Sequence, residues 1–162
     1  ERIRNLPEDS DQLVVTPELP MRLVVLEELA GLYRSFDAAK TQRDDPGKRV
    51  RALIGRLLAE GAKVGYRVLI LVQRAEAAVV DAFARAMCSW RVSFRCDNRA
   101  SVELLHPGCD GAIADAHTTA KPGIALVSMP GRALTRMRAP YLDGYANYTR
   151  AVRAACRPDL AA

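Results

Sequence analysis

The chain has 162 residues, of which 49% are hydrophobic and 27% are charged, and its 24 lysines and arginines outnumber its 19 aspartates and glutamates. This length and balance predict one globular domain and argue against a disordered tail or a fibre. No stretch approaches the roughly 18 to 20 apolar residues of a membrane helix, and no basic segment followed by an apolar one opens the chain, so we expect a soluble domain without a secretion leader.

The net charge of +5 is compatible with a nucleic acid or another anionic partner but demonstrates neither. A zinc site is not expected, because the cysteines form no C-x-x-C pair and the histidines lie outside finger spacing. These residues are Cys88, Cys96, Cys109, Cys156, His106 and His117. The polar start at Glu1, which is not Met, predicts a piece cut from a longer protein.

The first regular element is expected at residues 22–26, where a short apolar run with two β-branched residues predicts a fully buried strand. Glu27 and Glu28 end this run, and a short helix is expected from Leu29. The segment 37–47 is polar and has no apolar period, so it predicts an exposed loop.

An amphipathic helix is predicted from Lys48, because apolar residues recur at helical spacing. They are Val50, Leu53, Ile54, Leu57 and Leu58. A second buried strand is expected at 66–72, closed by Gln73 and Arg74. A helical stretch follows with its apolar residues inward, namely Val79, Val80, Phe83 and Met87.

The second half of the chain predicts an alternating third strand at 90–96, then a short helix with Val102, Leu104 and Leu105, capped by Asp97 or Asn98. Residues 106–122 are expected to form a loop. Extended runs at 124–129 and 133–137 flank Pro130-Gly131-Arg132, a good hairpin turn, and a last helix is expected at 145–156. Alternating strands and helices predict an α/β domain with a mainly parallel sheet and a C-terminal antiparallel hairpin.

The strand ends are the places to look for chemistry, because ligands of open α/β sheets bind at the carboxyl ends of the strands. One carboxylate of Glu27-Glu28 can hold Mg²⁺ through water while the other activates a water molecule, and the amide of Gln73 can bond to a phosphate or to that water. Plainer alternatives are a helix N-terminal acidic pair and, for Gln73-Arg74, a polar strand end.

A nucleotide site of this kind also needs a phosphate cradle, G-x-x-x-x-G-K-[ST], and the chain has none. Gly47-Lys48 follows Asp44-Asp45-Pro46 in place of a strand, and Arg49 stands where Ser or Thr must bind the metal. We therefore expect either that the protein is not an ATPase or that its cradle lies upstream of Glu1.

Three runs carry a family resemblance: LVVLEELAGL at 23–32, GKRVRALIGRLLAE at 47–60 and GYRVLILVQR at 65–74. They resemble the Walker B segment, the following helix and the sensor strand of FtsK/SpoIIIE DNA translocases. The likeness extends from about Thr16 to Tyr141 and is nearest to actinobacterial plasmid-transfer translocases. Three positions depart from the family pattern, where Glu27 replaces Asp, Val72 replaces Thr and Ala75 replaces Pro.

The resemblance implies a partial RecA-like P-loop NTPase core, with Walker A upstream of this chain. It implies a connecting segment at 1–20, the C-terminal part of a motor domain at 21–141 and a helical tail at 142–162. It also implies ATP and Mg²⁺ as cofactors, with Glu27 at the metal, Glu28 and Gln73 catalytic, and Arg74 beside the nucleotide. An arginine normally acts across the subunit interface in this family, and the candidates here are Arg56, Lys63 and Arg95.

Five cations lie in the loop before the amphipathic helix and in its first turn: Lys40, Arg43, Lys48, Arg49 and Arg51. The corresponding region of FtsK-like rings faces the central channel, so the resemblance implies that these residues contact DNA phosphates. A solvated loop is the alternative. Arg150, Arg153 and Arg157 share a helical spacing that favours a solvated surface.

The leading interpretation is therefore an ATP-driven motor that moves double-stranded DNA through a hexameric ring in the cytoplasm, with a membrane tether elsewhere in the intact protein as one possibility. A type VII secretion ATPase, which moves protein, is the second interpretation. The third is a non-catalytic DNA- or partner-binding module descended from such a motor. We expect this chain alone not to turn over ATP.

Overall fold

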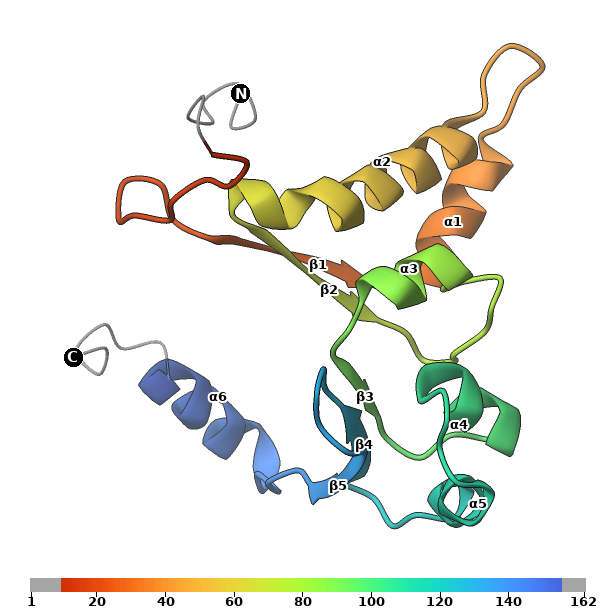
Figure 1. Ribbon diagram of the computed structural model, residues 1–162, viewed down its shortest axis with the longest axis vertical. Coiled ribbons are helices and arrows are strands. Elements are labelled where there is room, and N and C mark those ends of the chain that lie inside the picture. Colours follow the sequence, from red (N-terminus) through yellow and green to blue (C-terminus); the bar gives the residue numbers. More distant parts are fainter. Residues whose placement is uncertain (1–9, 156–162) are drawn as a thin grey trace.

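The computed structural model describes residues 10–155 and shows helices and strands in mixed order (Figure 1). The elements are β1 (Arg22–Glu27), α1 (Leu29–Ala38), α2 (Pro46–Glu60), the 3-10 turn η2 (Gly61–Val64), β2 (Tyr66–Leu71), α3 (Ala82–Met87), β3 (Arg91–Ser93), α4 (Arg99–Leu105), α5 (Gly111–Thr118), β4 (Ile124–Ser128), β5 (Thr135–Arg138) and α6 (Gly144–Ala155). No helix within residues 10–155 combines the length and apolar character needed to cross a membrane.

The strands form two sheets, a parallel pair β1–β2 and an antiparallel sheet in the order β3–β4–β5. The parallel register runs from Arg22 opposite Tyr66 to Glu27 opposite Leu71, so both strands end at the same edge. The expected hairpin of β4 and β5 is present, and the α/β class is confirmed. The third strand is shorter than expected and pairs antiparallel with β4, outside the parallel sheet.

The prediction that the first two strands are fully buried is wrong for the described structure. Helix α2 lies along one face of the β1–β2 pair (Figure 1), and side chains alternate between the two faces of a strand. The apolar side chains on the other face remain 42% to 59% exposed, namely Leu23, Val25, Leu69 and Leu71. A continuous apolar run indicates a strand but cannot report whether both of its faces are covered.

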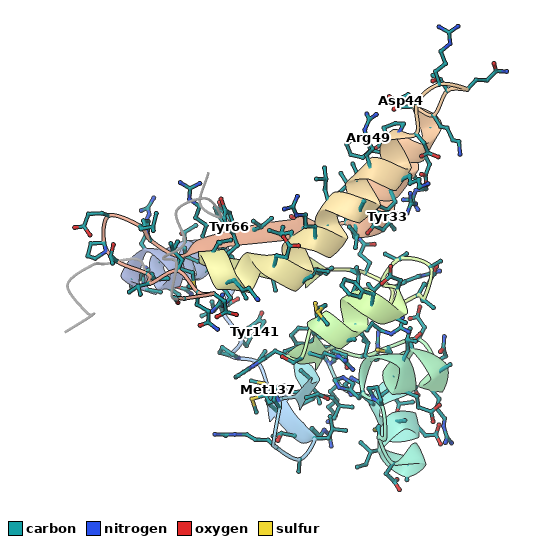
Figure 2. The ribbon with its side chains drawn as sticks, turned by 45° about the horizontal axis from the view of Figure 1, so that its top comes forward. Tyr33, Asp44, Arg49, Tyr66, Met137 and Tyr141 are labelled. Atoms are coloured by element: carbon teal, nitrogen blue, oxygen red, sulfur yellow. The ribbon has the colours of Figure 1, made fainter. Side chains whose placement is uncertain are left out.

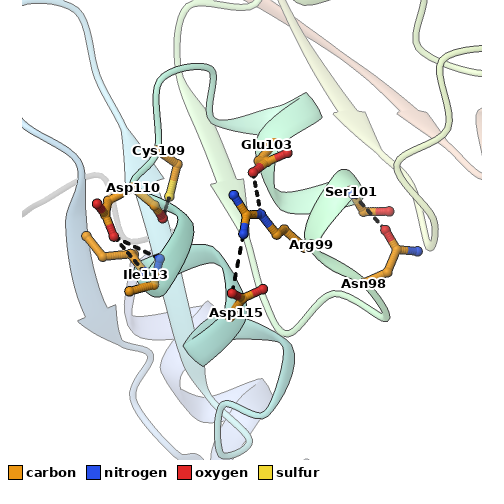
Figure 3. Close-up of polar contacts among 9 residues, drawn as sticks. Asn98, Arg99, Ser101, Glu103, Cys109, Asp110, Ile113 and Asp115 are labelled. Atoms are coloured by element: carbon orange, nitrogen blue, oxygen red, sulfur yellow. Dashed lines mark hydrogen bonds and ion pairs between the residues drawn. The ribbon is translucent and has the colours of Figure 1, made fainter.

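The main buried core lies against the antiparallel sheet, where Val102 of α4, Ala114 of α5 and Leu126 of β4 pack together at 2% exposure or less. Helix α5 was not predicted, because residues 106–122 read as a loop. The missed signal is Asp110, whose carboxylate accepts hydrogen bonds from the backbone N–H groups of Ala112 and Ile113 (Figure 3). The predicted cap at Asn98 is confirmed by its bond from the Ser101 N–H.

A buried polar network sits beside this core. The Ser93 hydroxyl lies 2.8 Å from Nε2 of His106, whose Nδ1 lies 2.6 Å from the Ser128 hydroxyl. His117 donates from Nε2 to the carbonyl of Phe94 over 2.9 Å. The network joins β3, β4, α5 and the end of α4, and it gives both buried histidines hydrogen-bond partners.

The helix predicted from Lys48 begins two residues earlier, at Pro46, because Asp45 caps it by accepting from the Lys48 N–H over 2.9 Å. Asp followed by Pro is a common pattern at the start of a helix. The loop expected at 37–47 therefore ends before Pro46. Pro46 and Gly47, expected in an exposed loop, are buried.

Three side chains expected to face inward do not. Leu53 is 66% exposed, Phe83 47% and Met87 44%, whereas Ile54 and Val80 are buried. Helical spacing identifies a stripe but does not give its width or its neighbours. The last helix ends at Ala155 within the described residues, and Cys156 and Arg157 lie outside them.

Candidate nucleotide-binding cleft

A cleft of about 310 Å³ opens where β1 and β2 end. Its polar lining comes from five side chains: Glu28, Arg34, Gln73, Arg74 and Glu76. Its apolar wall comes from Leu29, Ala30, Val72 and Val79. The structure therefore brings Glu28, Gln73 and Arg74 to one place, as expected from residues that follow two adjacent parallel strands.

Glu28 has an unusual backbone. Its φ of 53° and ψ of 50° place it in the left-handed region, and it is the only non-glycine residue among 10–155 with a positive φ. This conformation costs a residue with a Cβ about 1–2 kcal/mol, and such strain concentrates at functional sites.

The Glu28 carboxylate does not serve the helix that it precedes. Glu28 occupies the N-cap position of α1, yet its side chain accepts no capping hydrogen bond. Gly31 leaves room for it, because a Cβ on Gly31 would lie 3.1 Å from the Glu28 Cγ. The helix-capping alternative for this carboxylate therefore has no hydrogen bond to support it.

Two polar lining residues were missed by sequence reasoning, Arg34 and Glu76. Arg34 follows Ala30 by four residues on α1, and residues at that spacing share a helix face. Both line the cleft, but only the packing of α1 shows which of its faces does so. Glu76 follows Gln73-Arg74 in an irregular segment, where the sequence holds no comparable signal.

Glu27, the predicted metal residue, is the last residue of β1 and does not line the cleft. Alternation along the strand separates its side chain from its neighbour's. The three cations proposed to act across an interface also lie away from the cleft lining. Arg56 pairs with Glu60 over 2.9 Å and Lys63 with Asp11 over 3.1 Å, while Arg95 follows β3 and is exposed.

The predicted DNA-binding cations gather at the outer end of α1 and α2, where Figure 2 labels Asp44 and Arg49. Three of the five are paired with local carboxylates. Lys40 pairs with Asp45 over 2.6 Å, and Arg49 pairs with Asp44. Such exposed pairs contribute little to stability, but they reduce the local positive charge.

Arg51 closes the base of the same loop. Its guanidinium makes a two-bond contact with Asp37 over 2.7 and 2.8 Å and lies 4.3 Å from the centre of the Tyr33 ring. The hydrogen bond from Arg51 holds the pKa of the Asp37 carboxyl below its usual value. Only Arg43 and Lys48 of the five carry no ion pair with a described carboxylate.

No cluster of three or more His, Cys, Asp or Glu residues that could hold a metal ion occurs within residues 10–155. The three described cysteines are free thiols: Cys88, Cys96 and Cys109. Burial raises the pKa of each of them. A raised pKa favours the protonated thiol over the reactive thiolate.

Comparison with solved structures identifies the class of fold. The chain superposes on the pCW3 conjugation coupling protein TcpA, in a monomer form with ATPγS, with a TM-score of 0.66 and 20% identity over 86% of this chain and 38% of that one. It also superposes on the cytoplasmic domain of the Thermomonospora curvata type VII secretion ATPase EccC, with a TM-score of 0.60 and 19% identity over 81% of this chain and 13% of that one.

The chain has the fold of part of a P-loop ATPase domain, as the resemblance implied. Both superpositions agree with the fold that the likeness to FtsK/SpoIIIE-type translocases implied. The chain spans well under half the length of either protein. No family model and no curated protein matches its sequence.

Proposed function

We propose that this chain is part of an ATP-driven motor that moves double-stranded DNA, and that it supplies the water-activating side of the nucleotide site. The main observation that supports this proposal is the cleft at the ends of two parallel strands. Its lining combines the carboxylate of Glu28, on a strained backbone, with the Gln73 amide and the guanidinium groups of Arg34 and Arg74. Residues 21–141 are the proposed motor part, with a connecting segment before them and a helical tail at 142–162.

The proposed chemistry assigns one task to each polar side chain. The Glu28 carboxylate accepts a proton from the attacking water, and the Gln73 amide orients that water or bonds to the terminal phosphate. Arg34 and Arg74 stabilise the negative charge that develops on the phosphate oxygens. The Arg74 side chain is available for this because its contact with Asp97 is long, at 3.8 Å, and exposed.

The donor set fits ATP and Mg²⁺ on the terminal-phosphate side, since carboxylate oxygens suit Mg²⁺ and guanidinium groups suit phosphate. Bound Mg²⁺ would neutralise phosphate charge, and Glu27, which does not line the cleft, is proposed to hold it only through intervening water. Residues 10–155 contain no glycine-rich phosphate cradle, so in this proposal the cradle belongs to another part of the motor.

Duplex DNA is the proposed substrate, and a hexameric cytoplasmic ring is the proposed assembly. The support is the FtsK-like sequence pattern and the fold shared with a conjugation coupling protein. Within the predicted channel loop, the unpaired Arg43 and Lys48 are the strongest candidates for phosphate contact.

The test is Glu28→Gln in an intact motor that carries a phosphate cradle together with this chain. The amide keeps the shape of the side chain but cannot accept the proton, so turnover should fall at least about 100-fold while ATP binding stays near normal. Glu103→Gln on α4 is the matched control, because it makes the same change at a residue that does not line the cleft. Near-normal turnover in Glu28→Gln with loss in Glu27→Gln would reverse the two assigned roles.

Protein translocation is the second candidate function. It is favoured by the fold shared with EccC and by the ion pairs that neutralise three of the five loop cations. The double variant Arg43→Ala/Lys48→Ala distinguishes a motor that moves DNA from one that moves protein. A DNA motor should lose DNA-stimulated ATPase activity and keep its basal rate, whereas a protein-moving motor should show no DNA stimulation to lose.

A further inference from the structure

The positive charge of the chain is concentrated near its C-terminal end. The segment 130–155 holds one acidic residue, Asp143, against five arginines: Arg132, Arg136, Arg138, Arg150 and Arg153. Its formal charge is thus +4, compared with +5 for the whole chain. The rest of the chain is close to neutral, so this segment carries most of the net positive charge.

These arginines also form no ion pairs within the described residues. None of the five pairs with a described carboxylate, whereas seven other cations do, among them three of the predicted channel loop. An arginine without a local partner keeps its full charge and its five donors for a ligand.

The fold holds these residues on two exposed elements that follow each other closely. All four residues of β5 are exposed, and β5 is the end strand of its sheet, so alternation puts Arg136 and Arg138 together on one side. Helix α6 follows β5 directly (Figure 1), and none of its residues is buried. Arg150 and Arg153 lie one helical turn apart on α6.

Tyrosines flank the arginines on the same helix. Tyr145 and Tyr148 are 79% and 52% exposed, and their ring centres lie 6.2 Å apart. Tyr141 precedes the helix and is 84% exposed; in Figure 2 it lies on the same side of the molecule as Met137 of β5. Exposed tyrosine hydroxyls and arginines are donors that proteins use for DNA phosphates.

We infer that β5 and α6 form a second DNA-binding surface, which contacts the phosphates of duplex DNA through Arg136, Arg138, Arg150 and Arg153, with hydroxyl donors from Tyr145 and Tyr148. Helix α6 is about 18 Å long at 1.5 Å per residue, and duplex DNA carries one negative charge per roughly 1.7 Å of its axis, so one helix faces several phosphates. The inference rests on the proposed function in its choice of partner, but it requires no ATP.

An anionic membrane surface is the competing ligand for an amphipathic basic helix, and the structure disfavours it. The apolar stripe of α6 consists of Tyr145, Tyr148 and Val152, without the Leu, Phe or Trp that inserts into a bilayer. Two of the four arginines lie on the strand β5 and not on the amphipathic helix. The surface is therefore better suited to a phosphate backbone that stays in water.

The experiment measures the affinity of the 162-residue chain for two unrelated DNA duplexes by fluorescence anisotropy at several salt concentrations, without nucleotide. The variants are Arg136→Ala/Arg138→Ala and Arg150→Ala/Arg153→Ala, whose side chains are exposed, so the fold should be retained. Each should weaken both duplexes on the order of tenfold or more near 0.1 M salt and flatten the log–log salt slope by about 1.8, which is 0.9 per contact.

Two controls share the assay. Arg56→Ala/Arg99→Ala removes the same charge from cations already paired with Glu60 and Glu103, and it should leave the salt slope unchanged. Arg150→Lys/Arg153→Lys keeps the charge and should keep most of the slope. If the Arg56/Arg99 control flattened the salt slope equally, the effect would come from net charge alone, and the proposed surface would be wrong.

The remaining outcomes are equally informative. If the β5 and α6 variants bind normally while Arg43→Ala/Lys48→Ala does not, the inference is wrong and the proposed DNA motor stands. If the chain binds vesicles with 30% phosphatidylserine but neither duplex, the inference is also wrong. Loss of turnover in Glu28→Gln is measured separately, so failure of the ATPase proposal is distinguishable from failure of this surface.

Discussion

Acidification should destabilise this protein through one buried imidazole, that of His106. Its residue is 1% exposed and its ring bonds to two serine hydroxyls, from Ser93 and Ser128. Burial, followed by the nearby charges of His117 and Arg91, lowers the pKa of His106 from 6.5 to about 4. The folded protein therefore binds this proton more weakly than the unfolded chain does.

The size of the effect follows from the two pKa values. A difference between about 6.5 and about 4 corresponds to about 3 kcal/mol of unfolding free energy. Because the folded pKa is the lower one, this stability is fully present above pH 6.5 and is lost as the pH falls towards 4. About 2 kcal/mol of it should be gone at pH 5. Rotation of the serine hydroxyls to accept from the imidazolium makes these figures upper values.

The assay is urea unfolding of the wild-type chain and of His106→Gln at pH 7.5, 6 and 5. The variant starts less stable, since it loses buried hydrogen bonds, so the informative quantity is the change in free energy with pH within each protein. The carboxyls of Asp37 and Asp45 do not interfere in this range. Hydrogen bonds hold the pKa values of Asp37 and Asp45 below 3.8, so their contributions disappear only in stronger acid.

Wild type should lose about 2 kcal/mol more than His106→Gln between pH 7.5 and pH 5. Equal losses in both proteins would show that the imidazole is not the titrating group. An NMR titration offers an independent check, because a His106 midpoint near 6.5 in the folded protein would contradict the buried environment from which the prediction starts.

Three further changes test the fold and the cleft. Glu28→Gly removes the proposed base but should relieve the left-handed strain, so the unfolding free energy should stay within about 1 kcal/mol of wild type or rise. A decrease of about 2 kcal/mol or more in urea unfolding would contradict the strain. Asp45→Ala should remove the cap of α2 and cost about 1 kcal/mol, with Asp45→Asn as the control that restores most of it. Leu126→Ala should lower the free energy of unfolding by about 2–5 kcal/mol because it leaves a cavity in the core. Leu53→Ala, at an exposed position, should lower it by less than about 1 kcal/mol, and similar losses in the two variants would contradict the position of the core.

Much of the secondary structure could be predicted from local chemistry. The apolar run at 22–26, the helical spacing from Val50 and the Pro-Gly turn at 130–131 each specify an element through contacts within a few residues. The two helix starts that were missed, at Asp45 and Asp110, follow the same local rules, because a side-chain oxygen next to the first free N–H groups is enough to begin a helix.

The candidate cleft was predictable in part for a similar reason. Parallel strands end at a common edge, so Glu28 and Gln73 could be placed together before any coordinates were known. Arg34 could not, because which face of α1 turns towards the cleft depends on how that helix packs. The strained φ of Glu28 was equally inaccessible, since the sequence does not report the angle at which a strand enters a helix.

By itself, the sequence determined most of the helices and strands, the α/β class and the residues that follow the first two strands. Only the tertiary structure decided that one face of β1 and β2 stays exposed, that Arg51 pairs with Asp37 and that five C-terminal arginines pair with no described carboxylate. The physical reason is range: helix caps, turns, periodicity and the Lys40–Asp45 and Arg49–Asp44 pairs act over a few residues, whereas burial and the Arg51–Asp37 pair depend on segments that meet only after the chain has folded.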